Sequence, residues 1–175
     1  MNLPNKLTIA RVMVVPIFIV LFLLNFHLIA FVVFILAALT DLVDGQIARK
    51  YNLVSNFGKI MDPLADKILV YSAFCLMVEN GLIPGWMLIV ILTREFIVAG
   101  MRTVAASEGL VVAAGMSGKI KTVLQMVAVP MLLLVPVISW QSWVTASMIV
   151  LWASLLMTVY SGIEYIYQNR KVFTI

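Results

Sequence analysis

Long apolar stretches separated by short polar breaks dominate this chain. The stretches run from about residue 7 to 24, 28 to 48, 60 to 78, 84 to 106, 119 to 138 and 143 to 167. A helix that crosses a bilayer needs roughly 20 mostly apolar residues, and each stretch has about that length. The pattern therefore predicts six transmembrane helices that use nearly the whole chain, residues 1–175, as a single domain.

The composition agrees with a membrane protein and excludes several soluble classes. Of the 175 residues, 63% are hydrophobic and 11% are charged, and the mean hydropathy is +1.10. A soluble domain of this size cannot bury so much apolar surface, and a disordered chain needs low hydrophobicity. The net charge of +4 comes without a dense basic stripe, so no nucleic-acid partner is expected.

Lys and Arg residues fall almost entirely at the termini and in the even-numbered connections, and the other three connections carry none. Positive residues favour the cytoplasmic side of a membrane. The sequence therefore predicts an all-α integral membrane protein with six transmembrane helices and both termini in the cytoplasm. Arg94 is the exception, because it lies inside the fourth apolar stretch.

Four aspartates stand where a bilayer should exclude them. They form one pair spaced by three residues and one pair spaced by four, on two successive predicted helices, so each pair shares a helix face. At about 1.5 Å per residue, the pairs lie roughly 20 Å from the outer ends of their helices, at similar depth. These residues are Asp41, Asp44, Asp62 and Asp66.

Clustered carboxylates repel one another unless protons or cations neutralise them. Oxygen ligands suit Mg²⁺ or Mn²⁺, and no Cys or His lies nearby to favour zinc. The alternative is that some of the aspartates cap helices, and Asp62 before Pro63 fits that role. The cluster as a whole predicts a divalent-cation site.

Small residues and one arginine accompany the aspartates. Gly45, Ala48 and Gly58 either allow close helix packing or leave space for a ring or phosphate to approach the backbone. Arg49 either anchors the helix at the interface or binds phosphate oxygens. The full string Asp41-x2-Asp44-Gly45-x2-Ala48-Arg49-x8-Gly58-x3-Asp62-x3-Asp66 resembles the signature of the CDP-alcohol phosphatidyltransferases.

This resemblance implies a six-helix, homodimeric membrane enzyme that transfers a phosphatidyl group from CDP-diacylglycerol to an alcohol and releases CMP. It implies two divalent cations, Mg²⁺ or Mn²⁺, at the four aspartates, with Asp66 also acting as the base. Gly45, Ala48 and Gly58 would make room for the cytidine, with Arg49 near the phosphates. The site would face the cytoplasm from a bacterial cell membrane.

A second group of charged residues concerns the acceptor alcohol. Together they could form a basic pocket for an acceptor that carries a phosphate, such as glycerol 3-phosphate or inositol phosphate. The alternatives are buried structural ion pairs between helices, in which Arg94 and Glu95 each pair with another helix, and cytoplasmic anchoring by the lysines. The predicted acceptor-phosphate residues are Arg94, Arg102, Lys119 and Lys121.

Three further strings resemble the bacterial branch of the family whose acceptor is glycerol 3-phosphate. They are Thr93-Arg94-Glu95-Phe96, Gly100-x-Arg102 and Gly118-Lys119-Ile120-Lys121-Thr122-x2-Gln125. The N-terminal string Asn2-Leu3-Pro4-Asn5-x-Leu7-Thr8-x2-Arg11 is similar too. Its polar residues Asn5, Thr8 and Arg11 either share a face toward the CDP-lipid or begin a helix and anchor it.

Two other classes of function compete with this interpretation. A small ion or proton transporter also places carboxylates in the membrane, but it needs polar groups that continue across the bilayer. The predicted helices are apolar on the outer side of the aspartates. A structural assembly subunit would not need four clustered aspartates.

Overall fold

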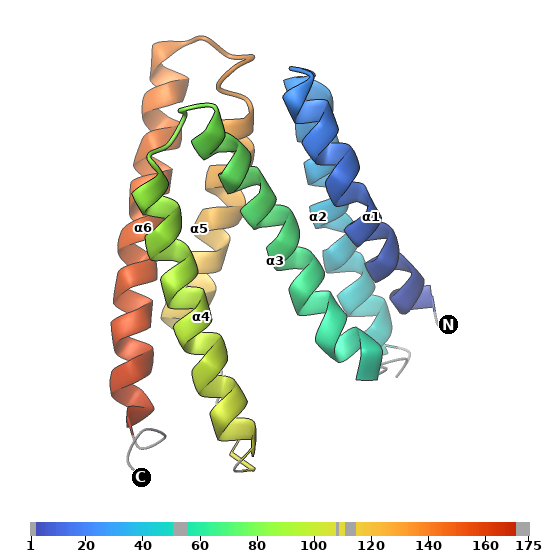
Figure 1. Ribbon diagram of the computed structural model, residues 1–175, viewed down its shortest axis with the longest axis vertical. Helices are drawn as coiled ribbons and strands as arrows, with labels where there is room; N and C mark the ends of the chain where they lie inside the picture. Colours follow the sequence, from blue (N-terminus) through green and yellow to red (C-terminus); the bar gives the residue numbers. More distant parts are fainter. Residues whose placement is uncertain (1–2, 51–55, 108, 111–114, 171–175) are drawn as a thin grey trace.

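A computed structural model describes residues 3–50, 56–107, 109–110 and 115–170. For residues 3–7, 41–50, 56–60, 62, 63 and 66, it describes the backbone alone. Within these ranges the chain forms six α-helices and no strand (Figure 1), which confirms the predicted all-α fold. The helices are α1 (Leu3–Leu23), α2 (His27–Lys50), α3 (Asn56–Glu79), α4 (Gly85–Ser107), α5 (Met116–Leu133) and α6 (Gln141–Gln168).

The helices differ from the predicted stretches mainly at their ends. α1 already begins at Leu3, and α2 and α3 extend into the polar connection that was expected from residue 49 to 59. α5 ends at Leu133, before the predicted end at residue 138. Pro136 explains the early end, because proline has no N–H to donate and its ring disfavours helical backbone in the preceding residue.

The turn between α3 and α4 depends on a glycine. Gly81 has φ +68°, in the left-handed region that costs glycine little. The Leu82 N–H donates to the Met77 carbonyl at 2.9 Å, and the Gly81 N–H donates to the Val78 carbonyl at 3.0 Å. These bonds satisfy carbonyls that the end of α3 leaves without helical partners.

The end of α5 is held by a side chain from α6. The Trp143 indole N–H donates to the Met131 carbonyl at 3.0 Å, while the Val135 N–H turns instead to the Leu132 carbonyl. Trp143 therefore satisfies a carbonyl that the helix itself does not.

Trp143→Phe is expected to lower the free energy of unfolding by about 1 kcal/mol, because it removes one net hydrogen bond and keeps an aromatic ring. Thermal unfolding of the detergent-solubilised protein should show a Tm lower by about 3 °C. Trp140→Phe is the control, since Trp140 is 71% exposed. Equal Tm values for the two variants would show that the bond contributes nothing.

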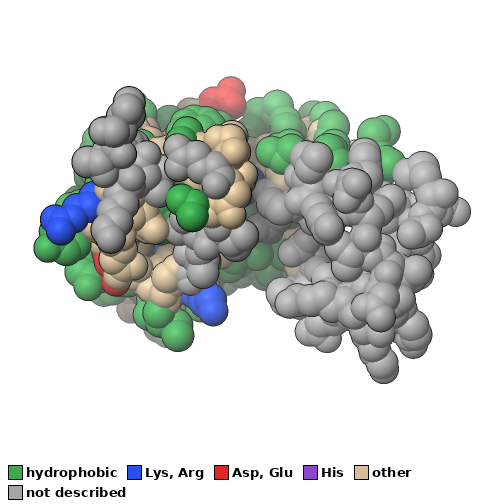
Figure 2. Space-filling view, turned by 90° about the horizontal axis from the view of Figure 1, so that it is seen from below, with side chains coloured by type: hydrophobic (Ala, Val, Ile, Leu, Met, Phe, Trp, Pro, Cys, Tyr) green, Lys and Arg blue, Asp and Glu red, His purple; other side chains and the backbone are tan. Residues whose placement is uncertain are grey.

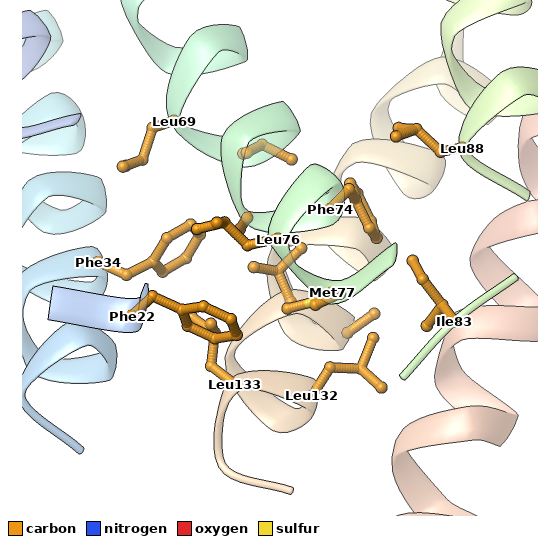
Figure 3. Packing of buried hydrophobic residues seen from close by; sticks show 14 of the residues in the cluster. Phe22, Phe34, Leu69, Phe74, Leu76, Met77, Ile83, Leu88, Leu132 and Leu133 are labelled. Carbon is orange, nitrogen blue, oxygen red and sulfur yellow. The ribbon is translucent and has the colours of Figure 1, made fainter. Parts of the chain in front are cut away.

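The apolar core occupies one end of the bundle and leaves the other end to polar residues. α1 packs against α2 and α3, α5 packs most extensively on α6, and α4 also packs on α6. The core gathers side chains from all six helices near the connections opposite the two chain ends (Figures 1 and 3). Its largest buried members include Phe18, Phe22, Phe34, Leu69, Phe74, Met77, Met87, Ile91, Leu132, Leu133 and Leu151.

The outside of the bundle is more apolar than part of its inside. Large apolar side chains are exposed on every helix, among them Met13, Ile89 and Leu156, which are each at least 65% exposed. Meanwhile Glu95, Lys121 and several serines and threonines are buried. This distribution is typical of helices that pack in lipid and place their polar groups between helices.

Among the described residues, α6 is long and apolar enough to cross a membrane, and only 33% of its apolar window is buried. The apolar parts of α1 and α2, residues 8–23 and 27–40, are shorter. The span of α6 therefore differs from the core helix of a soluble protein, which would be mostly buried.

Candidate functional site

The two aspartate pairs lie on helical backbone at the end of the bundle that carries both chain ends. Asp41 and Asp44 are in the second half of α2, and Asp62 and Asp66 are in the first half of α3 (Figure 1). Each pair therefore shares a helix face. The structure describes the backbone of these four aspartates and does not describe their side chains. Among the described side chains, no group of three His, Cys, Asp or Glu could hold a metal, so the cation site stays a prediction.

The helix-cap interpretation of Asp62 is wrong. α3 begins at Asn56, so Asp62 is in the second turn of the helix and does not precede its first residue. The N–H groups that need a cap are those of the first turn of α3, and Asp62 lies beyond that turn. The structure therefore removes the main structural explanation for this aspartate.

The small residues of the motif follow the same helix faces as the aspartates. Gly45 lies one turn beyond Asp41, Ala48 lies one turn beyond Asp44, and Gly58 lies one turn before Asp62. 

The other predicted CDP-lipid residues are spread over α1 and α2. Arg49 and Asn5 are in helical backbone, and their side chains fall outside the description. Thr8 is buried on α1.

A pocket of about 740 Å³ lies among α3, α4, α5 and α6 at the same end of the bundle. It brings together three of the predicted acceptor residues, Arg94, Arg102 and Lys119, and adds Lys67 from α3. Two carboxylates, Glu95 and Glu164, also line it.

Among the described lining residues, four cationic side chains against two carboxylates give a net positive charge, which suits an anionic ligand. Seen from this end, blue Lys and Arg side chains appear on the half formed by the later helices (Figure 2).

Glu95 is the centre of a buried ion-pair cluster that joins three helices. Its Oε1 accepts from Arg94 Nη1 at 2.7 Å and from Lys121 Nζ, and its Oε2 lies 3.3 Å from Lys67 Nζ. Glu95 is 7% exposed and Lys121 is 3% exposed. The alternative of an ion pair between helices is therefore present for Glu95, which pairs with Lys67 on α3 and Lys121 on α5. Glu95 also pairs with its neighbour Arg94, which the sequence did not indicate.

Lys121 occupies a different position from the other predicted acceptor residues. It does not line the 740 Å³ pocket but lines a neighbouring cavity of about 80 Å³ together with Lys67, Glu95 and Gln125. Its ammonium group is directed to Glu95. In this arrangement Lys121 holds Glu95 in place.

The two arginines of the pocket are oriented by α6. Arg94 Nε donates to Ser161 Oγ at 3.2 Å, and Arg102 Nε donates to the Tyr165 hydroxyl at 3.2 Å. The Arg102 guanidinium also lies 5.6 Å from the centre of the Tyr165 ring, within the range of a cation–π contact. Fixed guanidinium groups can bind phosphate oxygens with little further loss of side-chain entropy.

The wall that α6 contributes was missed by sequence reasoning, and Glu164 had no assigned role there. Ser161, Glu164, Tyr165 and Gln168 all line the pocket. A signal existed in the spacing, because Ser154, Thr158, Ser161 and Tyr165 follow one face of an otherwise apolar helix. Glu164 Oε1 accepts from Gln168 Nε2 at 3.0 Å, while its Oε2 is buried without a partner among the described residues.

Lys67 links the aspartate helix to the basic pocket. It directly follows Asp66 on α3, and its Nζ reaches across to Glu95 on α4. The backbone of Asp66 is therefore one residue from the ion-pair cluster. An anion held in the pocket lies close to the helix that carries the predicted base.

Comparisons with known proteins identify the family. The family model for CDP-alcohol phosphatidyltransferase matches residues 1–160. The chain is 46% identical to a CDP-diacylglycerol–glycerol-3-phosphate 3-phosphatidyltransferase of Bacillus subtilis, covering 96% of this chain and 95% of the relative.

It is also 39% identical to a protein of the same name from Rickettsia felis, covering 98% of this chain and 97% of the relative. It is 37% identical to a probable phosphatidylglycerophosphate synthase of Mycobacterium tuberculosis, covering 94% and 80%. The aspartate motif, the six helices and these matches show that the chain belongs to the CDP-alcohol phosphatidyltransferase family of enzymes.

Proposed function

We propose that this enzyme transfers the phosphatidyl group of CDP-diacylglycerol to sn-glycerol 3-phosphate, giving phosphatidylglycerol phosphate and CMP. The observation that carries the proposal is the net positive pocket next to the aspartate-bearing helix. A phosphorylated acceptor matches its charge, and a neutral acceptor such as serine does not. The names of the Bacillus and Rickettsia relatives support the same acceptor.

Asp66 acts as the base that takes the proton from the attacking hydroxyl of the acceptor. A carboxylate at this position needs to come within hydrogen-bond reach of that hydroxyl. Arg94, Arg102 and Lys119 bind the acceptor's phosphate in the pocket, which holds the hydroxyl toward α3. Fixing the acceptor in this way lowers the entropic part of the barrier.

The four aspartates fit two divalent cations, Mg²⁺ or Mn²⁺, because they offer oxygen ligands alone on two helical faces at one end of the bundle. Asp41, Asp44 and Asp62 would hold them, with Asp66 contributing to the second. Bound cations supply neutralisation of the charge on the attacked phosphate and on the leaving CMP.

The CDP-lipid would lie along α2 and the start of α3. Gly45, Ala48 and Gly58 leave room for the cytidine, and Arg49 lies near the phosphates. On α1, Asn5 and Thr8 face the same ligand. The spacing of Gly45, Ala48 and Gly58 from the aspartates, one helical turn each, supports the assignment for these three residues.

The enzyme crosses the cytoplasmic membrane of a bacterium with all six helices and has both termini and the site on the cytoplasmic side. The exposed apolar side chains on every helix and the Lys and Arg distribution support this topology. Protease accessibility of tags at each terminus in sealed inverted vesicles tests the orientation.

The enzyme also forms a homodimer, which light scattering of the detergent complex tests.

The acceptor is tested by CMP release from purified protein with CDP-diacylglycerol and Mg²⁺. Parallel reactions contain glycerol 3-phosphate, inositol phosphate, serine or no acceptor, and one set omits the metal. CMP release is expected only in the reaction that contains both glycerol 3-phosphate and Mg²⁺. Release with inositol phosphate or serine would reassign the acceptor, and no release with any of these acceptors from folded, metal-loaded protein would overturn the proposal.

A further inference from the structure

The side chain of Arg94 passes through a narrow slot between two glycines on different helices. A Cβ added to Gly162 on α6 would lie 3.0 Å from Arg94 Cγ, and one added to Gly118 on α5 would lie 3.2 Å from Arg94 Nη2. Both distances are shorter than ordinary van der Waals contact between such atoms. The absence of a side chain at both positions therefore defines the path of Arg94 from α4 to the pocket.

Arg94 cannot easily move aside, because two of its nitrogens are already bound. Its Nε donates to Ser161 Oγ, and its Nη1 donates to the buried carboxylate of Glu95 at 2.7 Å. Ser161 is itself oriented, since its hydroxyl donates to the Thr158 carbonyl at 3.1 Å and so presents a lone pair to Arg94. 

These bonds leave one nitrogen of Arg94 for a ligand. Nη2 has no hydrogen-bond partner among the described residues, and Arg94 lines the pocket.

Gly100, in the interior of α4, offers a contrast. A Cβ at Gly100 would meet nothing within 4 Å, although Gly100 lies on the same helix as Arg94, six residues further on. Close approach to Arg94 is therefore a property of Gly118 and Gly162 that Gly100 does not share. In a helix, glycine without such a reason is less stable than alanine.

We propose that Gly118 and Gly162 are positioning residues that aim Arg94 Nη2 at the phosphate of the acceptor and thereby set the affinity for it. Gly162 fixes the aliphatic part of the side chain, and Gly118 leaves space beside Nη2 itself. This inference rests on the proposed function, because it assumes that a phosphorylated acceptor occupies the pocket.

Gly162→Ala tests the proposal. The new methyl group should displace Arg94 and raise the KM for glycerol 3-phosphate about tenfold, since misplacing a binding group by less than 1 Å already weakens its contact. The KM for CDP-diacylglycerol should stay unchanged. Gly100→Ala is the matched control and should keep both KM values. The thermal unfolding of each variant is measured alongside.

A double variant separates an effect through Arg94 from a general packing defect. In an Arg94→Ala background the Cγ atom is gone, so adding Gly162→Ala should cause little further rise in KM. Additive effects would show that Gly162 acts independently of Arg94 and would overturn the proposal. An unchanged KM in Gly162→Ala would also overturn it.

The experiments distinguish a failure of the proposed function from a failure of the positioning role of the glycines. If the unsubstituted protein does not use glycerol 3-phosphate at all, the proposed function fails. If it does, and Gly162→Ala behaves like Gly100→Ala, the function stands and the positioning role fails. Equilibrium binding of glycerol 3-phosphate by calorimetry gives the same comparison without turnover.

Discussion

Asp66→Asn is expected to reduce CMP release by about a thousandfold, within the range that a general base contributes. The amide keeps the size of the side chain but cannot take a proton from the acceptor hydroxyl. It also removes a negative charge from the predicted cation site. The measurement is the rate of CMP release at saturating CDP-diacylglycerol, glycerol 3-phosphate and Mg²⁺.

Glu79→Gln is the matched control for this substitution. It makes the same carboxylate-to-amide exchange on the same helix, α3, but at the opposite end and at an exposed position. Glu79→Gln should therefore keep the activity of the unsubstituted enzyme. An active Asp66→Asn protein would show that another group accepts the proton.

Glu95→Gln is expected to lower the free energy of unfolding by about 3 kcal/mol, because breaking a buried ion pair leaves a charge without its partner. Lys121 is 3% exposed and would be left without its carboxylate. Lys67 is less affected, since its side chain is 41% exposed and can turn to solvent. The Tm of the detergent-solubilised protein should fall by about 10 °C.

A second substitution should restore most of that loss. In Glu95→Gln with Lys121→Met, the most deeply buried unpaired charge is gone, while Arg94 keeps its hydrogen bond to Ser161. Replacement of a buried pair by uncharged residues is often neutral. Glu79→Gln again serves as the control and should leave the Tm unchanged. If Glu95→Gln alone unfolds at the same temperature as the control, the cluster does not stabilise the bundle.

The number and order of helices could be predicted because each one is a long apolar run between polar breaks. The ends could not, because polar residues such as Asn5 and Arg49 also continue a helix when its hydrogen bonds are intact. The end of α5 was misplaced for a different reason. The predicted stretch ignored the effect of Pro136 on the residue before it.

Site residues that share a helix could be grouped from the sequence. Residues that meet only because two helices pack together could not. The two aspartate pairs, one spaced by three residues and one by four, can be seen in the sequence alone. In contrast, Arg94 lies 67 positions from Ser161, and only the packing of α4 on α6 brings them together. Neighbouring charges such as Arg94 and Glu95 also do not reveal which other helices they meet.

The two sides of α6 are subject to different rules of substitution. Ile149, Leu156 and Ile163 recur every seven residues on its exposed side. In the proposed topology this side meets lipid, which accepts almost any apolar side chain but excludes charge. Ser154, Thr158 and Ser161 lie on its buried side, where α5 and α4 pack on α6 and small side chains favour their close approach. Sequence drift in this helix should therefore conserve hydropathy on one side and volume on the other.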